Sequence, residues 1–165
     1  MSSSWTLPLF VKQMIEQEDV RVPDGVTQIM SPFFRSWFEA KSLEIPEGVT
    51  KIGNGAFQGW NSSTILKLPK SLTEIQANAF QNWHLLESLT LPENLESIGS
   101  FAFGACPKLT EVTVLASVPP VLIEEFSFIP FDWNVVEVVK VPAASVDLYK
   151  AAPIWSTVAD KIVAI

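Results

Sequence analysis

The chain has 165 residues, of which 48% are hydrophobic and 11% aromatic. This composition excludes a disordered chain, and the length fits one domain with a substantial core. Eleven basic and 18 acidic side chains give a formal net charge of −7. Nucleic acid and anionic membranes are therefore disfavoured as partners, because both are negatively charged. The one cysteine, Cys106, excludes an internal disulfide scaffold.

Residues 1–19 are predicted to form an N-terminal helical cap. Thr6 is a candidate N-cap and Pro8 stands near the first helical position, and apolar residues follow at mixed three-and-four spacing. The segment lacks the basic start and the uninterrupted apolar stretch of a secretory signal, and no membrane span is recognisable in the chain. A cytoplasmic location is therefore left open.

Residues 20–115 are built from a unit of 23 residues. The period is marked by a proline column, a phenylalanine column and a column of tryptophan that ends in cysteine: Pro23, Pro46, Pro69, Pro92; Phe34, Phe57, Phe80, Phe103; Trp37, Trp60, Trp83, Cys106. A fixed period of this size indicates a solenoid, in which each unit buries its apolar face against its neighbours.

Each unit contains a short alternating segment that ends at or near its proline. Two apolar residues flank one polar residue, and this alternation predicts a strand with one buried face. Proline ends the strand because it has no N–H for the hydrogen-bond ladder. Stacked units then form a parallel sheet whose outer face carries a polar row: Arg21, Glu44, Lys67, Thr90, Thr113 and Lys140. A second outward row flanks it: Asp19, Ser42, Ile65, Ser88, Glu111 and Val138.

Two further features recur on the other side of the unit. An apolar pair such as Val49 and Ile52 predicts a second, shorter extended segment, and an Ala-Phe pair such as Ala56-Phe57 predicts a turn or short helix with the ring inside. The tryptophan column has two interpretations. Outward rings would form an aromatic surface for sugar or protein contacts, whereas inward rings, which we favour, would fill the core.

Residues 116–165 are predicted to form an irregular terminal repeat and a C-terminal cap, in a chain that is a single domain overall. Ser145 is a candidate N-cap for a short helix through VDLYKAA that ends at Pro153. Trp155 is expected to fold over the last unit. Such a cap would cover the apolar interior that a solenoid exposes at its end.

The repeated residues resemble the BspA-like, or Treponema-type, leucine-rich repeat family. The pattern L-x-x-I-x-I-P-x-x-V-x-x-I-G-x-x-A-F-x-x-C is clearest in LTLPENLESIGSFAFGACPKL. The resemblance covers roughly residues 20 to 165, and it includes the C-terminal landmarks Tyr149, Trp155 and Ile162. The chain departs from the pattern by placing tryptophan where small, cysteine-like residues are usual. The resemblance implies a repeat solenoid with a curved parallel β-sheet, turns and short helices on the opposite side, and mostly surface or secreted bacterial members with inferred roles in adhesion and protein binding.

The sequence contains no convincing catalytic, cofactor-binding or metal-binding residues. His84 is the single histidine, so a histidine metal cluster is excluded, and Cys106 is interpreted as a buried structural thiol. Glu124-Glu125 is interpreted as part of a solvated loop, because neighbouring carboxylates usually point in different directions. Asn61-Ser62-Ser63 matches a glycosylation sequon, which is a weak pattern.

The sequence therefore predicts a non-enzymatic module that binds a protein or glycan through the strand face, at the polar row Arg21, Glu44, Lys67, Thr90, Thr113 and Lys140. Host extracellular matrix proteins are among the candidate partners, no cofactor or nucleic acid is expected, and the module is expected to be monomeric. By family resemblance it would lie at the cell surface or be secreted. One alternative is a structural or assembly module of a larger bacterial surface protein. Another, a glycan hydrolase, would need two opposed carboxylates in a cleft.

Overall fold

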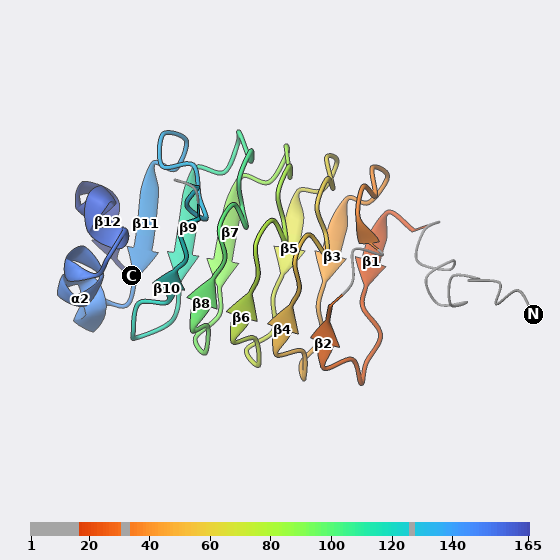
Figure 1. Ribbon diagram of the computed structural model, residues 1–165, viewed down its shortest axis with the longest axis horizontal. Helices are drawn as coiled ribbons and strands as arrows, with labels where there is room; N and C mark the ends of the chain where they lie inside the picture. The colour runs from red at the N-terminus through yellow and green to blue at the C-terminus, as the bar shows by residue number, and fades with distance from the viewer. Residues whose placement is uncertain (1–16, 31–33, 126–127) are drawn as a thin grey trace, which may run out of the picture.

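The computed structural model describes residues 17–30, 34–125 and 128–165. Successive turns of the chain stack side by side along one axis, with the earliest described turn at one end and the C-terminal helices at the other (Figure 1). The solenoid predicted from the 23-residue period is confirmed. The predicted N-terminal cap over 1–19 falls largely on residues 1–16, which lie outside the described residues.

The alternating segments form one wall of the solenoid, which we call the strand wall. Its strands are β1 (Asp19–Arg21), β3 (Ser42–Glu44), β5 (Ile65–Lys67), β7 (Ser88–Leu91), β9 (Glu111–Val114), β11 (Val138–Val141) and β12 (Ile162–Ala164). Pairing is parallel, and within the repeats it joins residues 23 apart, such as Val20 with Leu43 and Leu89 with Val112. The period of the sequence thus sets the register, and a shift by one residue would turn apolar side chains outward.

A second wall consists of the shorter extended segments. These are β2 (Gln28–Ile29), β4 (Lys51–Ile52), β6 (Glu74–Ile75), β8 (Ser97–Ile98) and β10 (Val121–Leu122), paired in the order β10-β8-β6-β4-β2. We call this five-stranded ladder the second wall. The Ala-Phe pairs that follow, such as Ala56-Phe57, lie in turns. Of the two predicted forms, turn and short helix, the turn is the one observed.

Aromatic rings fill the interior between the walls. The Phe57 and Phe80 rings stack with centroids 5.6 Å apart and planes 8° from parallel, and Trp60 and Trp83 repeat this with 5.6 Å and 1°. Trp60 and Trp83 are fully buried and Trp37 is 8% exposed, so the outward aromatic surface is wrong and the core interpretation is confirmed. The Trp83 indole N–H donates to the Phe57 carbonyl oxygen at 2.8 Å. The Trp60 indole N–H donates in the same way to the Phe34 carbonyl, so both tryptophans supply a partner for a carbonyl of the preceding turn.

The strand wall is interrupted at a single step, where the sequence predicts continuous pairing. β1, β3 and β5 form one sheet and β7, β9, β11 and β12 another, with no pairing between β5 and β7. The second wall continues across the same step through β6 and β8. The interruption coincides with a change of size in one buried column, from Ala40 and Ser63 to Leu86 and Leu109.

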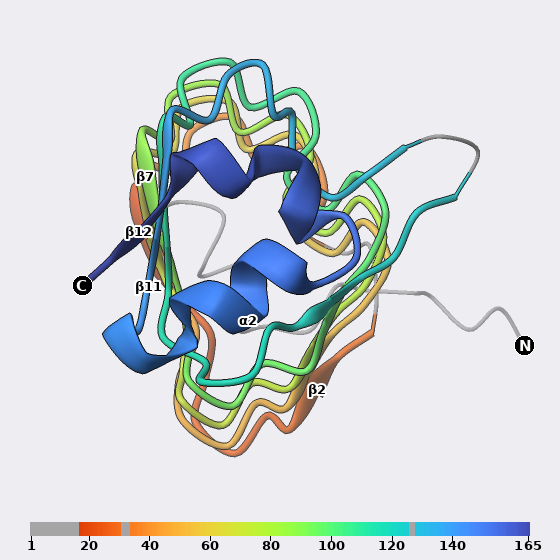
Figure 2. The ribbon, with the colours of Figure 1, turned by 90° about the vertical axis from the view of Figure 1, so that its left-hand side faces the viewer.

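The C-terminal cap covers the last turn. It consists of η2 (Ala143–Ser145), α2 (Val146–Ala151) and η3 (Trp155–Lys161), which lie across the end of the solenoid (Figure 2). Tyr149 Oη donates to the Ala116 carbonyl oxygen at 2.8 Å, and Trp155 Nε1 donates to that of Pro120 at 2.9 Å. Ser145 precedes α2 but makes no side-chain cap. Its hydroxyl donates instead to the Ser117 carbonyl at 2.8 Å, so the predicted capping role is wrong and Ser145 ties the cap to the last turn.

Candidate binding face

The polar row predicted from the alternation lies on the outer face of the strand wall. None of its six residues is buried: Arg21, Glu44, Lys67, Thr90, Thr113 and Lys140. Adjacent members are in register within each sheet, as with Arg21 and Glu44 in β1 and β3, or Thr90 and Thr113 in β7 and β9. The row is accessible because each member stands between two inward-facing residues on its strand.

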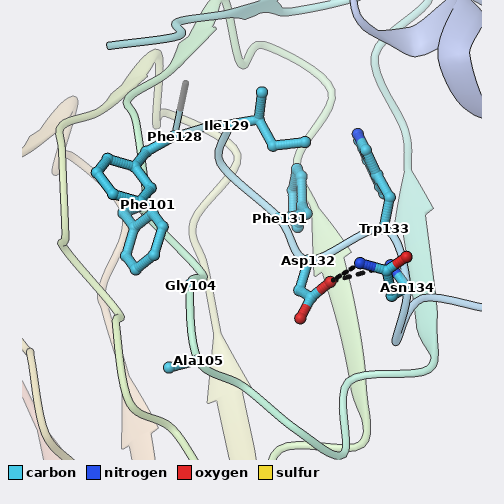
Figure 3. A pocket seen from close by; sticks show the side chains of 9 residues that line it. All are labelled: Phe101, Gly104, Ala105, Phe128, Ile129, Phe131, Asp132, Trp133 and Asn134. Atoms are coloured by element: carbon cyan, nitrogen blue, oxygen red, sulfur yellow. Dashed lines mark hydrogen bonds between the residues drawn. The ribbon is translucent and has the colours of Figure 1, made fainter. Parts of the chain in front are cut away.

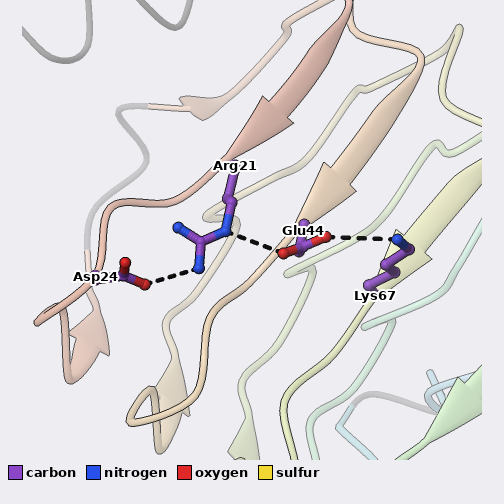
Figure 4. Close-up of polar contacts among 4 residues, drawn as sticks. All are labelled: Arg21, Asp24, Glu44 and Lys67. Carbon is purple, nitrogen blue, oxygen red and sulfur yellow. Dashed lines mark hydrogen bonds and ion pairs between the residues drawn. The ribbon is translucent and has the colours of Figure 1, made fainter.

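Alternating charges join the first three members of the row. The Arg21 guanidinium donates to Asp24 Oδ1 at 2.8 Å and to Glu44 Oε1 at 3.0 Å, and Lys67 Nζ lies 3.5 Å from Glu44 Oε2 (Figure 4). The hydrogen bond from Arg21 lowers the pKa of Glu44 from its ordinary value of 4.5. The hydrogen bond to Asp24 raises the pKa of Arg21. Glu44 is therefore ionised at neutral pH, which does not suit a general acid.

A shallow depression of about 320 Å³ lies over these three strands. Its floor mixes chemical types: Ser42 Oγ donates to Asp19 Oδ1 at 2.6 Å, while the neighbouring Ile65 is 51% exposed. The surface offers charge, hydroxyl groups and aliphatic area within one extended face. Such a mixture suits contact with a macromolecule better than the chemistry of a small reacting group.

The remainder of the row lies beyond the interruption. Thr90 and Thr113 carry hydroxyl groups, and Lys140 Nζ forms an ion pair with Glu111 Oε2 at 2.7 Å. Both ends of the face are therefore charged, and its middle, between Lys67 and Thr90, is where pairing stops.

The other candidate residues lie away from this face or are unsuited to chemistry. His84 is exposed, and burial raises the pKa of the Cys106 thiol to about 12, which keeps it protonated and unreactive. Glu124 and Glu125 are exposed, as expected for a solvated loop. Among the described residues, no group of three or more His, Cys, Asp and Glu side chains is placed to hold a metal ion.

The sequon residues are held within the fold. Ser63 is fully buried and its hydroxyl donates to the Ala40 carbonyl oxygen at 2.6 Å. Asn61 is partly buried, and its Oδ1 atom is out of contact with solvent. The hydroxyl of the sequon is therefore used inside the fold, to join this turn to the preceding one.

A second cavity, of about 250 Å³, lies beside the loop that precedes the cap (Figure 3). Phe101 and Phe128 meet there edge to face with centroids 4.7 Å apart, and the Phe131 and Trp133 rings stack at 5.0 Å. The carboxylate that lines the cavity, Asp132, is already hydrogen-bonded within its own loop. Its Oδ1 accepts from the backbone and side-chain nitrogens of Asn134 at 3.0 and 3.1 Å. Four of the nine residues that line the cavity are aromatic.

The family can be assigned from the repeats. A family profile described as "BspA type Leucine rich repeat region (6 copies)" matches residues 9–128. The chain belongs to the BspA-type leucine-rich repeat family. No curated protein matches it. In the described residues of this BspA-type protein, no helix has the length and apolar character needed to cross a bilayer.

Solved structures share the fold. A leucine-rich cell surface protein from Faecalibacterium prausnitzii is 26% identical, with a TM-score of 0.58, and the match covers 63% of this chain and 28% of that one. The pneumococcal vaccine antigen PcpA is 22% identical, with a TM-score of 0.63, and covers 90% of this chain and 40% of its own. The likeness to PcpA concerns the fold alone. This BspA-type chain thus spans less than half of either similar protein.

The sequence does not predict that the strands β5 and β7 are unpaired or that residues beside this step are partly exposed. Leu66 and Leu68 were expected to be buried like their equivalents in other units, and both are partly exposed. The one signal in the sequence was the replacement of Ala40 and Ser63 by Leu86 in the next unit. That change predicts a local difference in packing, but it does not tell which wall responds.

Proposed function

We propose that this chain is a non-enzymatic binding module that contacts a protein or glycan partner through the outer face of the strand wall. The single observation that supports it best is the contrast between columns. Inward positions repeat the same residue types from unit to unit, whereas the two outward rows change at nearly every strand. Packing explains repetition, and a varied, preformed surface is what selective recognition of one partner uses.

The charge arrangement supports the same face. Arg21, Glu44 and Lys67 hold one another in place across three strands, so the face presents ordered charges rather than freely rotating ones. Exposed ion pairs contribute little to stability. On a surface that a partner contacts, such charges would instead affect which partner binds and how fast it associates. Lys67 and Thr90 stand at the centre of the face and are the residues we place at the centre of the contact.

We also propose that the module works at a bacterial cell surface. Support comes from the family and from the F. prausnitzii protein, which is named a leucine-rich cell surface protein. Adhesion to a host protein is compatible with this location.

The test is a double charge reversal, Glu44→Lys with Lys67→Glu, which keeps the net charge. Partners are first captured with the parent protein from host extracellular matrix proteins and on a glycan array. We expect the reversed variant to lose about 1 to 2 kcal/mol of binding free energy, roughly five- to thirty-fold in affinity. Circular dichroism and the melting temperature verify that the variant folds.

The matched control is the reversal Lys51→Glu with Glu74→Lys. These residues form an ion pair between adjacent strands of the second wall, with Nζ and Oε2 2.9 Å apart. This control has the same composition change on the opposite side of the molecule and should bind like the parent. Equal affinity of a folded Glu44→Lys, Lys67→Glu variant and the parent would exclude the strand face as the contact.

A further inference from the structure

The interruption between β5 and β7 leaves a groove in the middle of the strand wall. The two strands do not pair, and few of their Cα atoms come within 8 Å of one another. Paired strands stand about 4.8 Å apart, and a strand inserted between two others would require about 9.6 Å. The wall lacks at this step the pairing that closes it elsewhere, and an inserted strand would need the wider spacing.

Backbone groups on both sides of the groove lack the partners that their equivalents have. Elsewhere in the wall, Ile45 N–H donates to the Lys67 carbonyl at 3.0 Å and Thr64 N–H donates to that of Lys41 at 2.9 Å. At this step the equivalent bonds would run from Leu68 N–H to the Thr90 carbonyl and from Glu87 N–H to the Thr64 carbonyl. All four residues are described, and neither hydrogen bond forms. One donor and one acceptor therefore face the groove from each side.

The groove has a defined shape. Its volume is about 400 Å³, and its walls include Leu66, Leu68 and Leu115, the last of which is 41% exposed. The turns beyond the strands stay joined, because Asn94 Nδ2 donates to the Lys70 carbonyl oxygen at 2.8 Å. Behind the groove, the stacked Phe80 and Phe103 rings keep the units in contact. The opening is therefore confined to the strands, and the aromatic core bounds it.

The rim of the groove is cationic in a protein whose net charge is −7. Lys67 and Lys70 line it, with side chains 68% and 75% exposed, and Lys70 Nζ forms an ion pair with Glu93 Oε1 at 3.8 Å, so two cations face one carboxylate there. Lys67 already pairs with Glu44 on its β3 side, and its other side faces the groove. An acidic side chain placed there would extend the alternation of charge that runs from Arg21 through Glu44 to Lys67.

We propose that this groove binds an extended peptide segment of a partner protein, which inserts as an additional parallel strand between β5 and β7. This inference rests on the proposed function, since it specifies how a protein partner contacts the strand face. The guest backbone would satisfy the free donors and acceptors on both sides, as in strand addition at a sheet edge. Its inward side chains are apolar, against Leu66 and Leu68, and an outward acidic residue stands beside Lys67.

The chain supplies a probe of this chemistry. The sequence KSLEIP of residues 41–46 contains β3 of the intact wall, with Leu43 and Ile45 buried and Glu44 outward. A synthetic peptide of this sequence, acetylated and amidated at its ends, is added to the full chain. Amide hydrogen exchange by NMR and fluorescence anisotropy of a labelled copy measure binding.

Four results are expected. In the free protein, the Leu68 and Glu87 amides exchange faster than those of Ile45 and Thr64. The peptide binds saturably and slows exchange of the amides that face the groove, Leu68 and Glu87 among them. A peptide N-methylated at alternate residues, which lacks donors, binds at least about tenfold more weakly. Lys67→Glu weakens binding, and a peptide with lysine in place of its glutamate restores it.

Lys51→Glu, on the second wall, is the control and should leave peptide binding unchanged. Equal protection of Leu68 and Ile45 in the free protein would mean that β5 and β7 pair in solution, and it would overturn the proposal. Absence of saturable peptide binding would overturn it as well. If the peptide does not bind but the Glu44→Lys, Lys67→Glu variant has lost affinity for the captured partner, the strand-insertion proposal has failed and the proposed function stands. If the peptide binds but that reversal leaves the captured partner unaffected, the proposed function has failed.

Discussion

The two walls of the solenoid respond differently to the same step between the third and fourth units. Across it the second wall keeps its pairing between Glu74 and Ser97, and the Phe80 and Phe103 rings stay 5.2 Å apart. The strand wall opens at this step between β5 and β7. Both walls carry the same period and similar residues, so the difference does not come from the repeat itself.

The comparison indicates that pairing in the strand wall is not needed to hold these units together, because the second wall and the aromatic core both continue across the step. Large stacked rings bury more apolar area than a strand of three or four residues does, and they have one geometry at which they fit. The ladder can lose a step without separating the units. The strand wall is thus free to carry a varied face and an opening, while the interior carries the stability.

The largest effect is expected from the core. Phe57→Ala should lower the free energy of unfolding by about 3 to 5 kcal/mol, because the ring is fully buried between Phe34 and Phe80 and its removal leaves a cavity. Chemical denaturation measures this. Thr90→Ala on the strand face is the control and should change stability by about 0.5 kcal/mol or less. A Phe57→Ala protein that melts within a degree or two of the parent would contradict the assignment of the core.

A second prediction concerns the origin of the opening. Leu86→Ala should cost about 2 to 5 kcal/mol as a buried truncation. If the larger side chain at this step keeps β5 and β7 apart, the same substitution should slow exchange of the Leu68 amide. Leu109→Ala, in the next unit, has a matched burial and should leave Leu68 unchanged. If the Leu68 amide exchanges at the same rate in Leu86→Ala as in the parent, the size of residue 86 does not cause the opening.

A third, smaller effect tests a hydrogen bond that links the second and third units, next to the open step. Trp83→Phe removes the N–H that donates to the Phe57 carbonyl and leaves that buried acceptor without a partner. The expected loss is about 1 to 3 kcal/mol. The melting temperature should fall less than in Phe57→Ala. A loss of similar size in both variants would mean that the indole ring, and not its hydrogen bond, dominates.

The smallest effect is expected on the strand face. Arg21 lowers the pKa of Glu44 in the folded protein, so the pair contributes stability above the ordinary pKa of 4.5 and loses it as pH falls through the lowered value. Glu44→Gln should therefore be slightly less stable than the parent at neutral pH, and the two should converge below pH 4.5. Because the pair is exposed, the difference should be small. Thermal melts across this pH range measure it, and a constant gap would contradict this assignment of the pKa shift.

The sequence by itself determined the solenoid, its register and its interior. A period of 23 residues places residues such as Val20 and Leu43 side by side, and apolar alternation excludes a shift by one residue, which would expose the apolar positions. For the same reason the outward row of Arg21, Glu44 and Lys67 could be predicted. These features depend on neighbours at a fixed distance along the chain, which a sequence displays directly.

Only the tertiary structure decided which way the tryptophans face, what Ser145 binds and where the strand wall opens. Trp83 faces inward because the Phe57 carbonyl of the previous turn needs a donor, and Ser145 binds the Ser117 carbonyl of the last turn instead of capping α2. Leu86 follows a unit with Ser63 at its position, but whether the resulting strain appears in one wall or the other depends on all the packing around both turns. A repeat specifies what each unit shares, and the packed structure decides how the differences between units are accommodated.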